Sequence, residues 1–347
     1  MSLNTTWFLL IAVLWVGYFI LEGFDFGVGM LLKTVAKTQA ERRTLITALG
    51  PVWDGNEVWL LVAGGATFAA FPEWYATLFS GFYLPLFLIL VSLIVRGVSF
   101  EYRSKHGDTK WRNRWDNAIV IASFVPSLLW GVAFANIARG VPLERSSAGV
   151  IEYTGGFFNL LNPFALVGGL VTLTLFATHG AFFIALKTEG TVRDRANQLA
   201  GKLGLATALL AVIFLGWLSL SYSDKTSVVV LSAVIVVAWL GALEANRRGR
   251  EGWAFLFSAV TSAMVVTTLF TALYPYVMPS SVNPEFSLDI FNASSTHYTL
   301  KVMTYVAVVL TPIVLIYQGW TYWVFRKRIS ATHIANADSG VLDKINN

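Results

Sequence analysis

Two pairs of acidic residues interrupt the first two long apolar stretches of this chain, where an ionisable side chain is costly. Glu22 and Asp25 are three residues apart in the first stretch, and Asp54 and Glu57 have the same spacing at the start of the second. A spacing of three places both members of a pair on one face of a helix. Acids inside apolar helices are typical of functional sites, so these four residues are the first candidates.

A fifth acid, Glu101, ends the third apolar stretch, which also contains Arg96. Titratable side chains spaced along adjacent helices predict a proton pathway that takes protons in from one side of a membrane. A purely structural interpretation stays open. Asp54 follows Pro51 at a helix start, where an acid complements the helix dipole. Arg96 could neutralise Asp25 or Asp54 as a structural ion pair.

Histidines and cysteines limit the metal chemistry that the chain can do. Cysteine is absent, and of the four histidines only His179 lies within an apolar stretch. His106, His297 and His333 fall in predicted loops or the tail. A bis-histidine haem site requires two residues that face each other at a similar depth. We therefore expect that the chain binds no metal or haem on its own.

The acids are positioned by nine apolar stretches, which predict an all-α integral membrane protein. Hydrophobic residues make up 56% of the 347 residues and charged residues 13%, and the mean hydropathy is +0.62. A membrane-spanning helix needs about 20 apolar residues, and only helices or closed barrels satisfy their backbone in lipid. The predicted spans are 7–32, 52–71, 78–100, 117–137, 161–186, 203–222, 227–243, 253–276 and 299–325.

The basic residues predict the orientation of these spans. Twenty Lys and Arg residues fall in alternate connections and the tail, against three in the remaining connections. Because positive loops stay in the cytoplasm, the N-terminus is predicted outside and the C-terminus inside. The start lacks a basic leader, so the first stretch is predicted to be retained. The net charge of +5 reflects this orientation and does not indicate nucleic-acid binding.

A weak internal repeat divides the single transmembrane domain, residues 1–347. Aligning Lys33-Thr34 with Lys187-Thr188 places His179 opposite Asp25. This predicts two parallel four-helix units, 7–137 and 161–276, and one extra helix, 299–325.

Small residues on these spans predict where helices pack closely. Gly23 and Gly27 are four residues apart on the first span, a spacing that lets a neighbouring helix approach. Gly64-Gly65 on the second span is interpreted in the same way.

Several strings of residues resemble subunit II of the cytochrome bd-type quinol oxidases, in order along nearly the whole chain. The strings begin at Glu22-Gly23-Phe24-Asp25-Phe26-Gly27 and continue with Trp53-Asp54-Gly55-Asn56-Glu57-Val58-Trp59, Phe100-Glu101-Tyr102-Arg103-Ser104-Lys105, Leu160-Leu161-Asn162-Pro163-Phe164 and Tyr276-Val277-Met278-Pro279-Ser280-Ser281.

The resemblance implies a multi-pass protein of the bacterial inner membrane that pairs with subunit I. The complex would reduce O2 to water with electrons from quinol. Haem b558, haem b595 and haem d would lie in subunit I, and this chain would hold none. Membrane lipid would surround the complex. Whether a small accessory subunit joins it is left open.

The resemblance also transfers roles to single residues. In the family, the acids that match Asp54 and Glu101 are implicated in a cytoplasmic proton path, and the residue that matches Trp59 in an oxygen tunnel. Some relatives have Asp at the position of Glu101, so a longer side chain would span the same gap here. Two other functions stay open: a proton-coupled secondary transporter built from repeats, and a purely structural scaffold.

Overall fold

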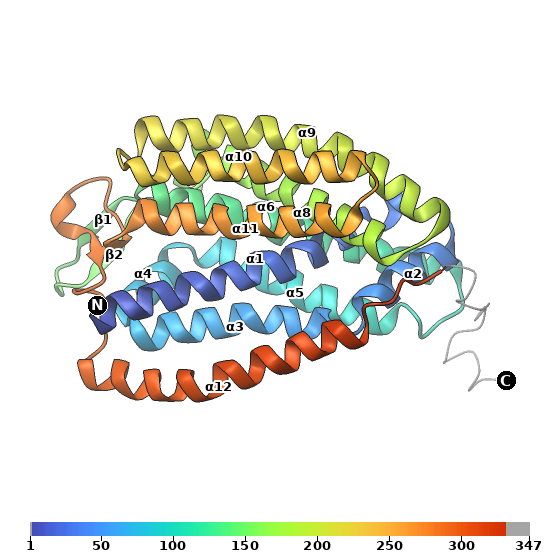
Figure 1. The fold of residues 1–347 in the computed structure, drawn as a ribbon. Helices are drawn as coiled ribbons and strands as arrows, with labels where there is room; N and C mark the ends of the chain where they lie inside the picture. Colours follow the sequence, from blue (N-terminus) through green and yellow to red (C-terminus); the bar gives the residue numbers. More distant parts are fainter. Residues whose placement is uncertain (1, 331–347) are drawn as a thin grey trace.

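Long helices account for the predicted membrane spans in a computed structural model, which describes residues 2–330 (Figure 1). The helices are α1 (Leu3–Val35), α2 (Gln39–Leu49), α3 (Trp53–Ala70), α4 (Pro72–Gly81), α5 (Tyr83–Tyr102), α6 (Thr109–Arg139), α7 (Gly156–Asn159), α8 (Pro163–Lys187), α9 (Gly190–Ser221), α10 (Thr226–Arg247), α11 (Glu251–Leu273) and α12 (His297–Val324). Within the described residues, eight helices are long and apolar enough to cross a membrane: α1, α5, α6, α8, α9, α10, α11 and α12.

The remaining predicted span, 52–71, corresponds to α3, which is not among these eight and has Asp54, Asn56 and Glu57 in its first turns. It ends at Ala70, and Pro72 begins α4. The predicted span 78–100 is divided between α4 and α5. The same acidic residues that suggest a function therefore lower the hydropathy of α3, by which a membrane-spanning helix is recognised.

Other boundaries also differ from the prediction. The span predicted at 203–222 belongs to α9, which already begins at Gly190, and the short span 227–243 belongs to the longer α10. The connection after the first span contains an additional helix, α2. Its start is fixed by a capping box between Thr38 and Glu41, an arrangement that satisfies two free backbone N–H groups.

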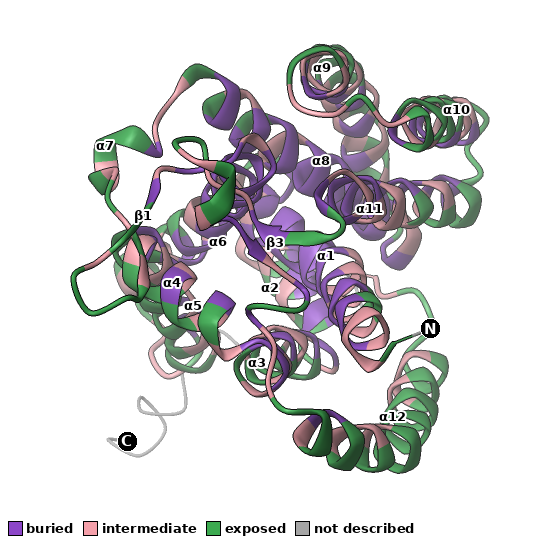
Figure 2. Ribbon diagram, turned by 90° about the vertical axis from the view of Figure 1, so that its left-hand side faces the viewer, coloured by how far each residue is buried: buried purple, intermediate pink, exposed green. Residues whose placement is uncertain are grey.

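The centre of the bundle is the crossing of α1 and α8. Gly27 and Gly180 meet there: a Cβ atom built on Gly27 would lie 2.7 Å from the Gly180 Cα atom. Phe24 and Phe183 stack beside the crossing, with ring centroids 4.2 Å apart. Figure 2 shows that buried residues concentrate in α1, α8 and their neighbours α6 and α11, while exposed residues lie on the peripheral helices.

The packing pairs follow a similar order in the two halves of the chain. Helix α1 packs against α3 and α6, and α8 packs against α9 and α11. Helices α5 and α6 form a close pair, as do α10 and α11. Helix α12 packs mainly against α1 and α3, and Leu300 is its single buried residue.

Short strands join the helices at the end of the bundle where the N-terminus lies (Figure 1). They are β1 (Leu143–Arg145), β2 (Ile151–Tyr153), β3 (Tyr276–Met278) and β4 (Leu288–Asp289). Each neighbouring pair is antiparallel. The all-helical prediction is therefore correct for the membrane part of the chain, and these loops add two small sheets to it.

Candidate functional site

A buried arginine and two acids from three different helices form the centre of the site. The Arg96 guanidinium on α5 donates to Glu22 on α1, and it donates to Glu57 Oε1 on α3 over 3.0 Å. The side chains of Arg96 and Glu22 are fully buried, and that of Glu57 is 20% exposed. Arg96 also lies over the ring of Phe26, 4.8 Å from its centroid. A buried guanidinium with two carboxyl partners holds the three helices together.

Asp25, the second acid of α1, lies fully buried beside this ion cluster and has a different partner. Its Oδ2 atom accepts a hydrogen bond of 2.7 Å from the Asn56 amide on α3. Asn56 is fully buried as well. The structure therefore pairs Arg96 with Glu22 and Glu57, and not with Asp25 or Asp54 as the sequence suggested.

Asp54 and Glu101 are exposed in this chain, unlike the other three predicted acids. They lie at the same end of the bundle, because the ring of Trp53 on α3 contacts that of Phe100 on α5 at 5.2 Å. Asp54 directly follows Trp53 and Glu101 directly follows Phe100, so each acid adjoins one ring of this contact. Asp54 is three residues before Glu57, and so on the same side of α3.

Trp59 lies deeper along α3, where its indole ring packs on Gly17 of α1. Its Nε1 atom donates to Gln318 Oε1 of α12 over 2.8 Å. Gln318 and Tyr322 of α12 in turn contact Asn56. Sequence reasoning missed both residues of α12. The sequence feature that could have revealed them is Gln318, because it is a lone amide side chain inside the apolar span 299–325.

His179, the candidate aligned with Asp25, is fully buried, and both of its ring nitrogens are engaged. Nδ1 lies 2.7 Å from the Ser258 hydroxyl, and Nε2 lies 3.1 Å from the Ile20 carbonyl oxygen. The ring stacks on Phe255. This geometry leaves His179 no nitrogen for an iron ion. Among residues 2–330, no group of three or more His, Cys, Asp or Glu residues could hold a metal.

Further ion pairs fix the basic end of the bundle. Asp116, a buried acid just before the span predicted at 117–137, accepts from Arg103 over 2.5 Å and from Arg42 over 3.0 Å. Arg195 donates to Glu41. Burial disfavours the ionised form of Glu41, but the Arg195 guanidinium and the backbone N–H groups of Lys37 and Thr38 outweigh it and lower the Glu41 pKa. These contacts position the loops around the acids.

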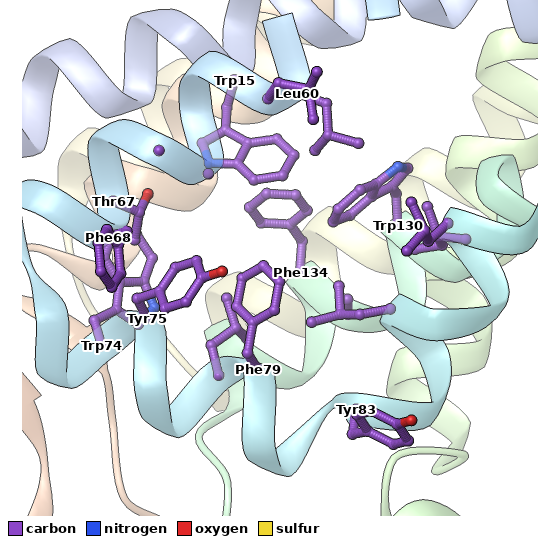
Figure 3. A pocket seen from close by; sticks show the side chains of 18 of the residues that line it. Trp15, Leu60, Thr67, Phe68, Trp74, Tyr75, Phe79, Tyr83, Trp130 and Phe134 are labelled. Atoms are coloured by element: carbon purple, nitrogen blue, oxygen red, sulfur yellow. The ribbon is translucent and has the colours of Figure 1, made fainter. Parts of the chain in front are cut away.

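A separate apolar cavity of 440 Å³ lies between α1, α3, α4, α5 and α6 (Figure 3). Aromatic and aliphatic side chains line it, and the aromatic ones include Trp15, Trp74, Tyr75, Trp130 and Phe134. Gly64 and Gly65 of α3 border it and have no neighbour within 4 Å of a built Cβ atom. Within residues 2–330 no helix packs against these two glycines, so the predicted close approach occurs at Gly27 and not here. Trp59 is not among the lining residues.

The fold and the site together define a multi-pass helical membrane protein that holds several carboxyl groups and one arginine inside its bundle. Comparison with known proteins narrows this class. The chain belongs to the cytochrome bd terminal oxidase subunit II family, whose model matches residues 3–325. It is 40% identical to cytochrome bd-I ubiquinol oxidase subunit 2 of Escherichia coli strain K12, over 96% of both chains.

Two further relatives support this assignment. Cytochrome bd ubiquinol oxidase subunit 2 of Bacillus subtilis strain 168 is 40% identical over 95% of this chain and 97% of the relative. The fold resembles a chain from the structure of bd oxidase from Geobacillus thermodenitrificans, with a TM-score of 0.75 and 19% identity. That match covers 94% of this chain and all of the other. The protein is thus a multi-pass protein of the bacterial inner membrane and a subunit of a terminal oxidase.

Proposed function

We propose that this chain is the non-haem subunit of an oxidase complex that reduces O2 to water with electrons from quinol. Its partner, subunit I, holds haems b558, b595 and d and the quinol site. This chain supports subunit I and carries protons to it from the cytoplasm. The observation that carries the proposal is the Arg96 guanidinium bound to Glu22 and Glu57, with Asp25 buried beside them. Asp54 and Glu101 are exposed at the same end of the bundle.

The charge of the buried cluster supports proton binding. Glu22 and Glu57 share a single cation, Arg96, and Asp25 is bound by the Asn56 amide alone among residues 2–330. Glu22 Oε2 and Asp25 Oδ1 are buried without a hydrogen-bond partner in the described part of the chain. A buried ionised carboxyl that lacks compensation costs several kcal/mol. A cluster with more carboxyl groups than cations is therefore stabilised by holding protons, as a proton path requires.

Exposed Asp54 and Glu101 supply the intake end of this path. They lie where basic residues gather, at the end of the bundle that the charge asymmetry places in the cytoplasm. Protons would pass from these acids to Glu57, which precedes the fully buried Glu22 and Asp25. The order runs from exposed, through partly buried, to buried side chains.

The same exposed acids indicate where subunit I binds. Lipid is a poor neighbour for an ionised carboxyl group, whereas a protein partner can offer hydrogen bonds. The face around them is apolar and exposed on α3 and α5, with Val58, Leu61, Ile94 and Val98 among its residues. We place subunit I on this face, so that the acids become enclosed between the two subunits.

Oxygen supply is a separate part of the proposal. Trp59 would line an oxygen tunnel, and its contacts with Gly17 and Gln318 fix the ring at the junction of α1, α3 and α12. The two parallel units 7–137 and 161–276, the extra helix 299–325 and the outside N-terminus also belong to the proposal. The similar packing order of the two halves supports the units.

The decisive experiment replaces Asp54 with asparagine in the complex with subunit I. We expect Asp54→Asn to slow quinol-driven oxygen consumption while haem absorbance stays unchanged, because proton supply is impaired and the haem sites persist. Glu73→Gln is the matched control, since Glu73 is an exposed acid on α4, away from the cluster. It should leave turnover unchanged. Normal turnover in an intact Asp54→Asn complex would favour the scaffold function.

A second experiment tests the assignment of the haems. The purified chain alone should show no haem absorbance, whereas its complex with subunit I should. Haem retained in stoichiometric amount by the isolated chain would overturn the non-haem role. Proton-coupled transport by the isolated chain in vesicles would instead support the transporter function.

A further inference from the structure

Helix α12 makes few contacts with the bundle, yet two of its polar side chains reach the acid cluster. Tyr322 donates its hydroxyl hydrogen to Asn56 Oδ1 over 2.8 Å, and Gln318 Nε2 donates to the same oxygen over 3.3 Å. Asn56 Nδ2 then donates to Asp25 Oδ2 over 2.7 Å. The extra helix is thus linked to a proposed proton-carrying acid through one amide.

The direction of this hydrogen-bond chain is fixed at one end by Trp59. An indole N–H can only donate, so the Gln318 atom that faces Trp59 has to be the amide oxygen. This orients the Gln318 NH2 group toward Asn56, and the Asn56 atom that receives it has to be oxygen. The Asn56 NH2 group is then left to donate to Asp25.

The fixed direction has a consequence for Asp25. Because Asn56 always donates, Asp25 Oδ2 has to accept, and a proton on this carboxyl group has to reside on Oδ1. Asp25 Oδ1 is buried and makes no hydrogen bond among residues 2–330. The chain of amides therefore reserves one oxygen of Asp25 for the exchanged proton and holds the other as an acceptor.

We infer that Gln318 and Tyr322 are positioning residues of the proton path: they orient Asn56 so that it donates to Asp25 and sets how readily Asp25 releases its proton. This role rests on the proposed proton path. The amides themselves carry no proton onward, since each is held in one orientation. The same chain ties Trp59, the proposed oxygen-tunnel residue, to the acid.

Other charged and titratable groups surround Asp25 and enter any pH dependence. They are Glu22 on its own helix, Glu57 on α3, Arg96 on α5 and Tyr322 on α12. His179 on α8 is engaged by Ser258 and by the Ile20 carbonyl. Gln318→Met also removes the acceptor of the Trp59 indole N–H, whereas Tyr322→Phe leaves that contact in place and therefore isolates the effect on Asn56.

The test uses the complex with subunit I and compares Gln318→Met, Tyr322→Phe and Asp25→Asn. The readouts are the pH profile of oxygen consumption and the carboxyl C=O stretching band in infrared spectra that Asp25→Asn removes. We expect each α12 variant to shift the profile midpoint upward by about half to one pH unit, because a weaker donor at Asn56 leaves the proton held more tightly. The carboxyl band should change frequency in both variants.

Thr321→Val is the matched control, because the Thr321 hydroxyl bonds only to the Tyr317 carbonyl of its own helix. It should leave both readouts unchanged, and haem content reports assembly in every variant. The positioning role is overturned if midpoint and band stay unchanged in both α12 variants while Asp25→Asn slows turnover. Unchanged turnover in Asp25→Asn would overturn the proton path itself, and the positioning role with it.

Discussion

Replacing Gly27 with alanine tests how closely the two central helices must approach. The new Cβ atom would lie 2.0 Å from the Phe176 carbonyl oxygen and 2.7 Å from the Gly180 Cα atom. Both contacts are with backbone, so no side-chain rotation relieves them, and α1 and α8 must separate by about 1 Å. Overpacking of a core costs about 1–3 kcal/mol. We expect a loss of at least about 3 kcal/mol, because the crossing is central and rigid.

The measurement is the thermal unfolding midpoint of the detergent-solubilised complex, with Gly64→Ala as control. Gly64 has nothing within 4 Å of a built Cβ atom, so alanine there should be neutral or stabilise by up to about 1 kcal/mol. Gly23→Ala should fall between the two, because its Cβ atom meets the ring of Phe176, which can move. Equal midpoints for Gly27→Ala and Gly64→Ala would show that the close approach does not determine stability.

Two further substitutions test the ion pairs. Arg96→Met should destabilise the complex by about 3–5 kcal/mol, since it leaves Glu22 buried without a cation; an unchanged thermal midpoint would contradict the pairing. Glu41→Gln should cost about 1 kcal/mol at pH 7, because the neutral amide can still close the capping box but binds Arg195 more weakly than the carboxylate does. Because the Glu41 pKa is lowered in the folded protein, this difference should be complete above the ordinary glutamate pKa and be lost as the pH falls through the lower folded value. A difference that persists in acid would assign the effect to packing.

The membrane-spanning helices could be predicted from sequence because lipid allows so few backbone structures. Helix α3 shows the limit of that reasoning. Its acids and Asn56 make it the least apolar of the predicted spans, so its own composition gives the weakest membrane signal among them. Helix α2 was missed because its apolar residues are few, and its start depends on the local capping box at Thr38.

The partners of the acids could not be predicted in the same way. Arg96 is 74 residues from Glu22 and 39 from Glu57, and only the packing of α1, α3 and α5 decides which carboxyl groups it meets. The Gly64-Gly65 pair shows the same limit. Glycine spacing alone does not say whether the space beside it is filled by a helix, as at Gly27, or forms a cavity.

Neutralising the two exposed acids should separate the proton-path function from the scaffold function. The proton path predicts full assembly with slower oxygen consumption, whereas the scaffold function predicts weaker assembly with unchanged turnover. In the isolated chain, Asp54→Asn with Glu101→Gln removes two exposed charges beside an apolar face, and an ionised acid in contact with lipid costs up to about 2.5–3.5 kcal/mol at the bilayer centre and less near its surface. The isolated variant should therefore unfold at a higher temperature. In the complex the same variant should assemble with full haem content yet consume oxygen more slowly, because its intake end no longer binds protons. Weaker association with subunit I and unchanged turnover per complex would mean that the acids bind the partner subunit and carry no protons.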